Sequence, residues 1–159
     1  MPALVPWLVF IHVLSAIIAF GPSFAFGLYG SRAAAEPQHG NFMARANHYV
    51  LDRMVIPVAL SMPVSGLLIV WASGIDLLKA HWLLLAIGVY IVAILYATLV
   101  QRQAVIRMVE LTSASPPAGA PPGPPPGLPE TAAKIRQGGM LLGTLIVIIV
   151  ALMVVKPAF

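Results

Sequence analysis

His12 is the residue of this chain best suited to chemistry, because it is a titratable group in an otherwise apolar run. The run WLVFIHVLSAIIAFG, residues 7–21, contains no formally charged side chain. An imidazole in such a run needs a partner, a cofactor or a water-filled cavity to offset its cost. Three interpretations follow: an interhelical hydrogen bond to a serine, threonine or backbone carbonyl, an axial ligand of haem or another metal, or a proton-relay or substrate contact in an outward-facing cavity.

The helical face that carries His12 is otherwise small. On a helix, His12 shares a face with the residues three, four, seven and eleven positions further on, which are Ser15, Ala16, Ala19 and Ser23. Small residues allow a neighbouring helix to approach closely. The sequence therefore predicts that His12 points into a helical bundle rather than toward lipid.

The other histidines are weaker candidates for a cofactor site. His81 begins the third apolar stretch beside Trp82, and His39 and His48 lie in the first connection, on the opposite side of the membrane. A bis-histidine haem needs two imidazoles at similar depth, whereas His12 and His81 differ by roughly 10 Å along their helices. His81 is thus only a second candidate ligand for haem b. The chain has no cysteine, no H-E-x-x-H motif and no phosphate-binding glycine loop, so no metal site built from such motifs is expected.

The elements that position these residues follow from composition. Of the 159 residues, 60% are hydrophobic and only 9% are charged, and the mean hydropathy is +0.94. Soluble domains carry about 25% charged residues, so here the apolar surplus must face lipid. A helix needs about 20 apolar residues to cross the hydrocarbon core. We therefore expect a single membrane domain over residues 1–159, all-α, polytopic and folded as a four-helix transmembrane bundle, with spans at about 6–29, 54–73, 82–101 and 138–155.

The direction of threading follows from the basic residues. Most of them lie in the first and third connections, and the opposite side of the membrane has only Lys79 and Lys156. Positive loops stay cytoplasmic, so both termini are expected outside. This topology accounts for the basic pI, and no nucleic-acid partner is expected because the basic residues form no patch. The basic residues of the two cytoplasmic connections are Arg32, Arg45, Arg53, Arg102, Arg107, Lys134 and Arg136.

The first connection is predicted to be partly helical. The segment NFMARANHYVLDRM, which begins at Asn41, extends the second span into the cytoplasm, and Pro57 and Pro63 are expected to kink the buried part. Asp52 lies near the end of this segment, just before the second span. It is either a solvated helix end or a partner of Arg102 or Arg107 at the mouth of the bundle.

Two further segments carry short motifs. Residues 115–129, SPPAGAPPGPPPGLP, contain eight prolines and three glycines, which predicts an extended low-complexity spacer in the cytoplasm. Gly139 and Gly143 form a G-x-x-x-G motif in the fourth span. Such a motif provides close packing within the bundle or in a homo-oligomer.

Four motifs together resemble the bacterial integral-membrane family catalogued as domain of unknown function number 2269. They are IHVLSA, LDRMVIPVALSMPVSGLLI, HWLLLAIGVY and LMVVKP, and they cover nearly the whole chain. The resemblance implies four membrane helices, an unassigned activity and a bacterial inner membrane. The chain departs from the family in the third span, which has YATLVQ where a tryptophan and a proline are expected. Its characteristic positions correspond here to His12, Asp52, Pro63, Gly66, Trp82, Lys156 and Pro157.

A more distant similarity concerns cofactors. A histidine early in the first of four spans is similar to the arrangement in the membrane-embedded haem-binding protoporphyrinogen oxidases and in copper-resistance membrane domains. The oxidases also have a lysine within a later span, which this chain lacks, so only haem ligation is implied and not oxidase activity. The leading hypothesis is therefore a small haem-binding or redox-associated membrane protein that uses His12. The alternatives are a structural or accessory membrane subunit without cofactor, and a small-solute or proton pathway.

Overall fold

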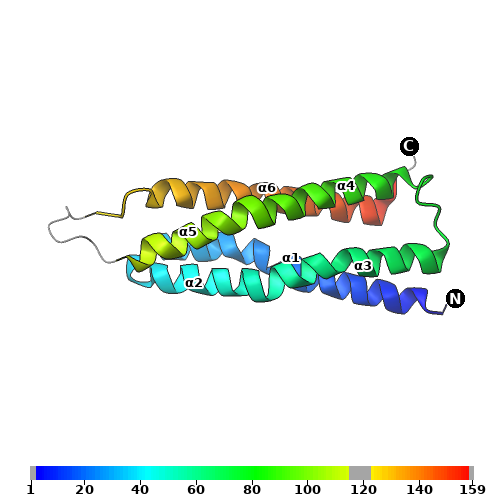
Figure 1. Cartoon of the computed structure of the whole chain (residues 1–159), viewed down its shortest axis with the longest axis horizontal. Helices are drawn as coiled ribbons and strands as arrows, with labels where there is room; N and C mark the ends of the chain where they lie inside the picture. The colour runs from blue at the N-terminus through cyan, green and yellow to red at the C-terminus, as the bar shows by residue number, and fades with distance from the viewer. Residues whose placement is uncertain (1–2, 115–122, 158–159) are drawn as a thin grey trace.

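The computed structural model describes residues 3–114 and 123–157, and these residues fold into four long helical rods without a strand (Figure 1). Each rod contains an apolar stretch long enough to cross a membrane, which confirms the all-α four-helix membrane fold. The first rod is α1 (Val5–Ala35), and the fourth is α6 (Leu128–Val155). The second rod follows the short η1 (Pro37–His39) and joins α2 (Gly40–Val50), η2 (Leu51–Val55) and α3 (Ile56–Ser73). The third rod joins α4 (His81–Tyr96), η3 (Ala97–Gln101) and α5 (Arg102–Ser113).

The rods are longer than a bilayer requires. The 31 residues of α1 extend over about 46 Å, whereas the hydrocarbon core is about 30 Å thick. Both chain termini and the loop from α3 to α4 lie at one end of the molecule, which we call the terminal end. The connections from α1 to α2 and from α5 to α6 lie at the other end, which we call the basic end (Figure 1). The more polar helices α2 and α5 lie at the basic end.

The predicted helical extension of the second span is present as α2, whereas α5 and the first turns of α6 were not predicted. The fourth helix begins at Leu128, so the last two residues of the proline-rich segment belong to it. Pro129 is tolerated there because the first turn of a helix has no donor to lose, and Gly127 adopts the left-handed φ of 84° that starts this turn. Residues 115–122 of the predicted spacer lie outside the described residues.

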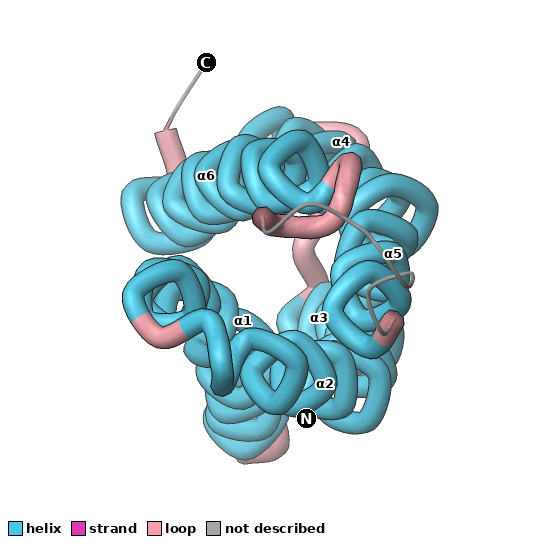
Figure 2. Tube along the Cα trace, turned by 90° about the vertical axis from the view of Figure 1, so that its left-hand side faces the viewer, coloured by secondary structure: helices cyan, strands magenta, loops and turns pink. Residues whose placement is uncertain are grey.

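Seen from the basic end, the rods form a ring (Figure 2). Contacts join α1 to α3, α2 to α5, α4 to α6, and α6 to both α1 and α5. Two apolar clusters lie in the interior. One, built on Ala19, Ala59 and Met62, holds α1, α3 and α4 together. The other, built on Leu51, Val55 and Val105, lies toward the basic end.

Large apolar side chains on the outside of the rods are exposed, as a lipid environment requires. Trp7, Leu67 and Val147 each have more than half of their surface uncovered. No polar or charged residue is fully buried within the described parts of the chain. The polar side chains that form hydrogen bonds between rods are therefore only partly buried.

Candidate functional site

His12 lies against α3, where it meets a serine. Its Nδ1 is 2.7 Å from Ser65 Oγ, and that hydroxyl in turn donates to the Met62 carbonyl at 2.9 Å. A serine hydroxyl has a single hydrogen. With this hydrogen on the Met62 carbonyl, Ser65 accepts from His12 Nδ1–H. In the neutral imidazole the Nε2 atom then keeps its lone pair.

Gly66 lies beside this imidazole. A Cβ on Gly66 would lie 3.5 Å from His12 Cε1, which is ordinary van der Waals contact. Ala19, on the same face of α1, is completely buried. The prediction that His12 faces the bundle is confirmed, and the partner is a serine on another span, as the hydrogen-bond interpretation expected.

His81 occupies a different level of the bundle. It is the first residue of α4, at the terminal end, whereas His12 is the eighth residue of α1. Along its own helix His12 lies about 10 Å beyond the start of α1, whereas His81 is at the start of α4. Within residues 3–114 and 123–157, no three His, Asp or Glu side chains gather as a metal site would need.

Tyr90 provides a contact that sequence reasoning missed. Its hydroxyl donates to the Ala59 carbonyl at 2.5 Å, which joins α4 to α3. In an α-helix the carbonyl of residue 59 accepts from the N–H of residue 63, but residue 63 is a proline and has none. Tyr90 therefore replaces the donor that Pro63 removes. A proline within a span was the available signal, since it predicts a free carbonyl four residues earlier.

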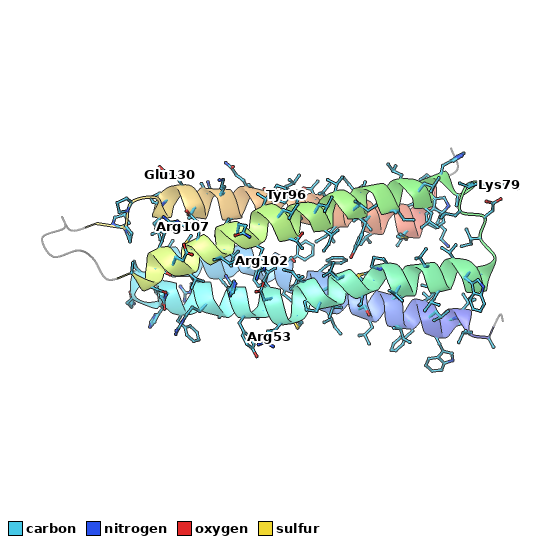
Figure 3. All side chains as sticks on the ribbon, viewed as in Figure 1. Arg53, Lys79, Tyr96, Arg102, Arg107 and Glu130 are labelled. Carbon is cyan, nitrogen blue, oxygen red and sulfur yellow. The ribbon has the colours of Figure 1, made fainter. Side chains whose placement is uncertain are left out.

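Asp52 and Arg102 form a bidentate ion pair between the second and third rods. Arg102 Nε donates to Asp52 Oδ1 at 2.9 Å, and Nη2 donates to Oδ2 at 2.8 Å. His48 Nε2 is 3.5 Å from Oδ2 and makes no hydrogen bond. Figure 3 shows Arg102 between the two rods. The pairing interpretation of Asp52 is thus confirmed for Arg102, while Arg107 binds Glu110 instead.

A wide helical turn adjoins each partner of this ion pair. Asp52 lies within η2, where the N–H of Ile56 bonds to the carbonyl five residues earlier. Arg102 directly follows η3, and its own N–H bonds to the Ala97 carbonyl, again five residues earlier. Such π-turns insert an extra residue into a helix and often occur at functional sites. Each changes the direction in which the following side chains point.

The glycine that permits close packing in α6 is Gly138 rather than the two glycines of the motif. A Cβ on Gly138 would overlap Gln101 Oε1 and lie 2.9 Å from Tyr96 Oη. The Gln101 amide uses this space to donate to the Ile135 carbonyl at 3.0 Å. By contrast, a Cβ on Gly139 would meet nothing within 4 Å.

The other glycine of the motif packs loosely inside the chain. A Cβ on Gly143 would lie 3.9 Å from Phe24 Cε1 of α1, which is ordinary van der Waals contact. Within the motif, Gly143 therefore makes an internal contact, whereas Gly139 faces open space. A homo-oligomer formed through Gly139 and Gly143 stays a prediction.

Trp82 and Lys156 meet at the terminal end. Lys156 Nζ is 5.7 Å from the centre of the Trp82 ring, within the range of a cation–π contact. Lys156 ends α6 with a left-handed φ of 47°, which non-glycine residues adopt rarely, and Pro157 prevents the helix from continuing. This contact fixes the end of α6 against the start of α4.

One comparison with known proteins gives a match. The family model described as "Predicted integral membrane protein (DUF2269)" matches residues 6–157. No curated protein and no solved structure matches the chain.

Proposed function

This chain belongs to the family of predicted integral membrane proteins DUF2269. We propose that it is a structural or accessory subunit of a protein complex in a bacterial inner membrane, and that it binds no cofactor. The proposal rests on one observation: polar side chains inside the bundle form hydrogen bonds between rods. His12 binds Ser65, Tyr90 binds the Ala59 carbonyl, and both contacts join one rod to another.

The lipid environment explains why these polar groups bind each other. In the hydrocarbon core no water satisfies a backbone or side-chain polar group, so each must find a partner in the protein. Side-chain hydrogen bonds across membrane helices contribute about 0.6 kcal/mol on average. Together with the ion pair of Asp52 and Arg102, these contacts link α1 to α3 and the second rod to the third. Residues used in this way set the geometry of the bundle and need no ligand.

The proposed orientation rests on charge. The basic end carries Arg45, Arg53, Lys134 and Arg136, and basic connections stay in the cytoplasm. The terminal end, with both chain termini, would then face the periplasm. His12 would lie in the half of the bilayer nearer the periplasm.

A second candidate is a haem b protein, and the tautomer of His12 favours it. Histidines that bind metals usually donate their other ring N–H to a neighbouring acceptor, which orients the ring. Ser65 supplies that acceptor here, and the Nε2 atom is left with a lone pair. One ligand of the required chemistry is therefore available. Haem would supply electron transfer, while Ser65 and Gly66 would hold the imidazole.

An absorption spectrum separates the two candidates. The full chain, expressed with added haem and purified in mild detergent, is measured oxidised and then reduced with dithionite. A flat spectrum from a folded, monodisperse sample supports the proposal of a cofactor-free subunit. A Soret band that is lost in His12→Ala and retained in His39→Ala, a histidine at the basic end, contradicts it and supports haem binding.

A further inference from the structure

His48 lies beside the ion pair of Asp52 and Arg102 without a hydrogen bond of its own. Its Nε2 atom is buried, is 3.5 Å from Asp52 Oδ2, and forms no hydrogen bond with any residue that the structure describes. A buried polar atom that loses water and gains no partner costs free energy. The imidazole is therefore incompletely satisfied in this arrangement.

A protonated His48 would complete the arrangement. Asp52 is a carboxylate, because the guanidinium of Arg102 donates to both of its oxygens and a neighbouring opposite charge favours the ionised form. A carboxylate has about four lone-pair sites, so Asp52 can accept a further bond. The separation of 3.5 Å is slightly longer than an ordinary N–H···O hydrogen bond of about 2.7 to 3.2 Å. A small movement of the side chains would close it.

The neutral ring fits this position less well than the charged ring. Neutral imidazole carries one proton, on either nitrogen, whereas imidazolium carries a proton on both. Only the charged ring therefore always has a donor on Nε2 and is also attracted to the carboxylate. Histidine is the side chain that ordinarily changes charge between pH 5 and 8.

The other charges around His48 are more exposed than this cluster. Its helix α2 packs against α1, η1, η2 and α5. The side chains of His48 and Asp52 are only 32% and 25% exposed, so water and salt screen this pair less than exposed charges. The exposed tyrosines Tyr29 and Tyr49 stay neutral below about pH 8. The remaining titratable side chains on these five elements, apart from Arg102, are also exposed, and they are Arg32, His39, Arg45, Arg53, Arg107 and Glu110.

The cluster lies where the second and third rods begin to separate. Contacts join α2 to α5, whereas α3 and α4 lie apart toward the terminal end (Figure 1, Figure 2). Arg102 lies between the two rods near the start of this separation (Figure 3). A further bond to Asp52 would strengthen the contact from which the two rods diverge.

We propose that His48 is a pH-sensitive clasp between the second and third rods. In acid, its imidazolium donates from Nε2 to Asp52 Oδ2 beside Arg102, and in base the neutral ring loses this attraction. The unfolded chain offers the imidazolium no such partner, so the added stability is present at low pH and is lost as the pH rises. In the proposed orientation, acidification of the cytoplasm tightens the clasp. This inference does not depend on whether the chain binds a cofactor.

The test is the melting midpoint of the full chain in mild detergent at about pH 5.5 and about pH 8, the range in which histidines titrate. The advantage of the wild type over His48→Gln, which is neutral at both pH values, should be about 2 to 4 °C larger in acid, the shift that one added interaction gives in a chain of this size. His48→Lys is a cation at both pH values. Its difference from His48→Gln should therefore not change with pH.

The matched control is His39→Gln, which removes an exposed histidine 3.3 Å from Glu36 and should keep the wild-type pH profile. In an Asp52→Asn background, His48→Gln should have the same effect at both pH values. A wild-type pH profile in His48→Gln would overturn the clasp. It would also be overturned if the wild type melted below His48→Gln in acid, because the imidazolium would then be repelled by Arg102 more than it is attracted to Asp52.

Discussion

The Tyr90 hydroxyl compensates for Pro63 across the gap between two helices. Pro63 leaves the Ala59 carbonyl without its helical donor, and Tyr90 of α4 donates to that carbonyl. The proline in α3 and the tyrosine in α4 are therefore one structural unit. Proline is tolerated at this depth because a neighbouring helix satisfies the free carbonyl.

This relationship gives the first prediction, a double-mutant cycle. Tyr90→Phe removes the donor and should lower the stability of the bundle by about 1 kcal/mol. Pro63→Ala restores an N–H four residues after Ala59, so Tyr90→Phe should cost clearly less in that background. The measurement is the melting midpoint of the four proteins in the same detergent. Equal costs in both backgrounds would show that Tyr90 and Pro63 act independently.

His12 and Ser65 should also be coupled. Ser65→Ala removes the acceptor of the Nδ1 proton and should cost about 0.6 kcal/mol, the average for hydrogen bonds between membrane helices, and at most about 1.7 kcal/mol. His12→Ala should cost more, because it also leaves a void beside Gly66. Once His12 is absent, Ser65→Ala should have little further effect. Ser61→Ala is the matched control, since its exposed hydroxyl bonds only within α3.

The ion pair of Asp52 and Arg102 predicts rescue by charge reversal. Asp52→Asn leaves the guanidinium without its carboxylate, and Arg102→Gln leaves the carboxylate without its guanidinium. Each should lower the melting midpoint. The exchanged pair Asp52→Arg/Arg102→Asp should recover part of the loss, because a pair of opposite charge is formed again. If the exchanged pair melts below both single variants, the contact is not governed by charge.

Gly138 should tolerate substitution less well than Gly139. Alanine at position 138 displaces the Gln101 amide from the Ile135 carbonyl, which should cost about 1 kcal/mol. Alanine at position 139 meets open space and should be neutral or slightly stabilising, since glycine is a poor helix former. Thermal melting of the two variants checks the order. The reverse order would place the close helix contact at Gly139 and favour a dimer through that residue.

The proposed topology is open to labelling, because the chain contains no cysteine. Lys79→Cys lies in the loop at the terminal end, and Arg107→Cys lies on α5 toward the basic end. A membrane-impermeant maleimide should label the first variant in intact spheroplasts and the second only after lysis. Both side chains are exposed, so a failure of access is not expected in lysed cells. Labelling of Arg107→Cys in intact spheroplasts would reverse the orientation.

The sequence alone determined the class and the plan of this protein. Four apolar stretches predict four helices in a membrane because hydrophobicity and helix length are local properties that no other part of the chain can change. The small residues that follow His12 correctly predicted the face that meets a neighbour. The resemblance identified the family from four short motifs. These inferences needed no knowledge of how the helices are arranged.

Only the tertiary structure decided which polar groups meet. A shift of one residue turns a helical side chain by about 100°, so partners depend on the rotation and depth of two helices at once. The π-turns before Ile56 and before Arg102 change that rotation, and no composition pattern reveals them. For this reason Arg102 rather than Arg107 binds Asp52, and Tyr90 was not predicted as the partner of the Ala59 carbonyl.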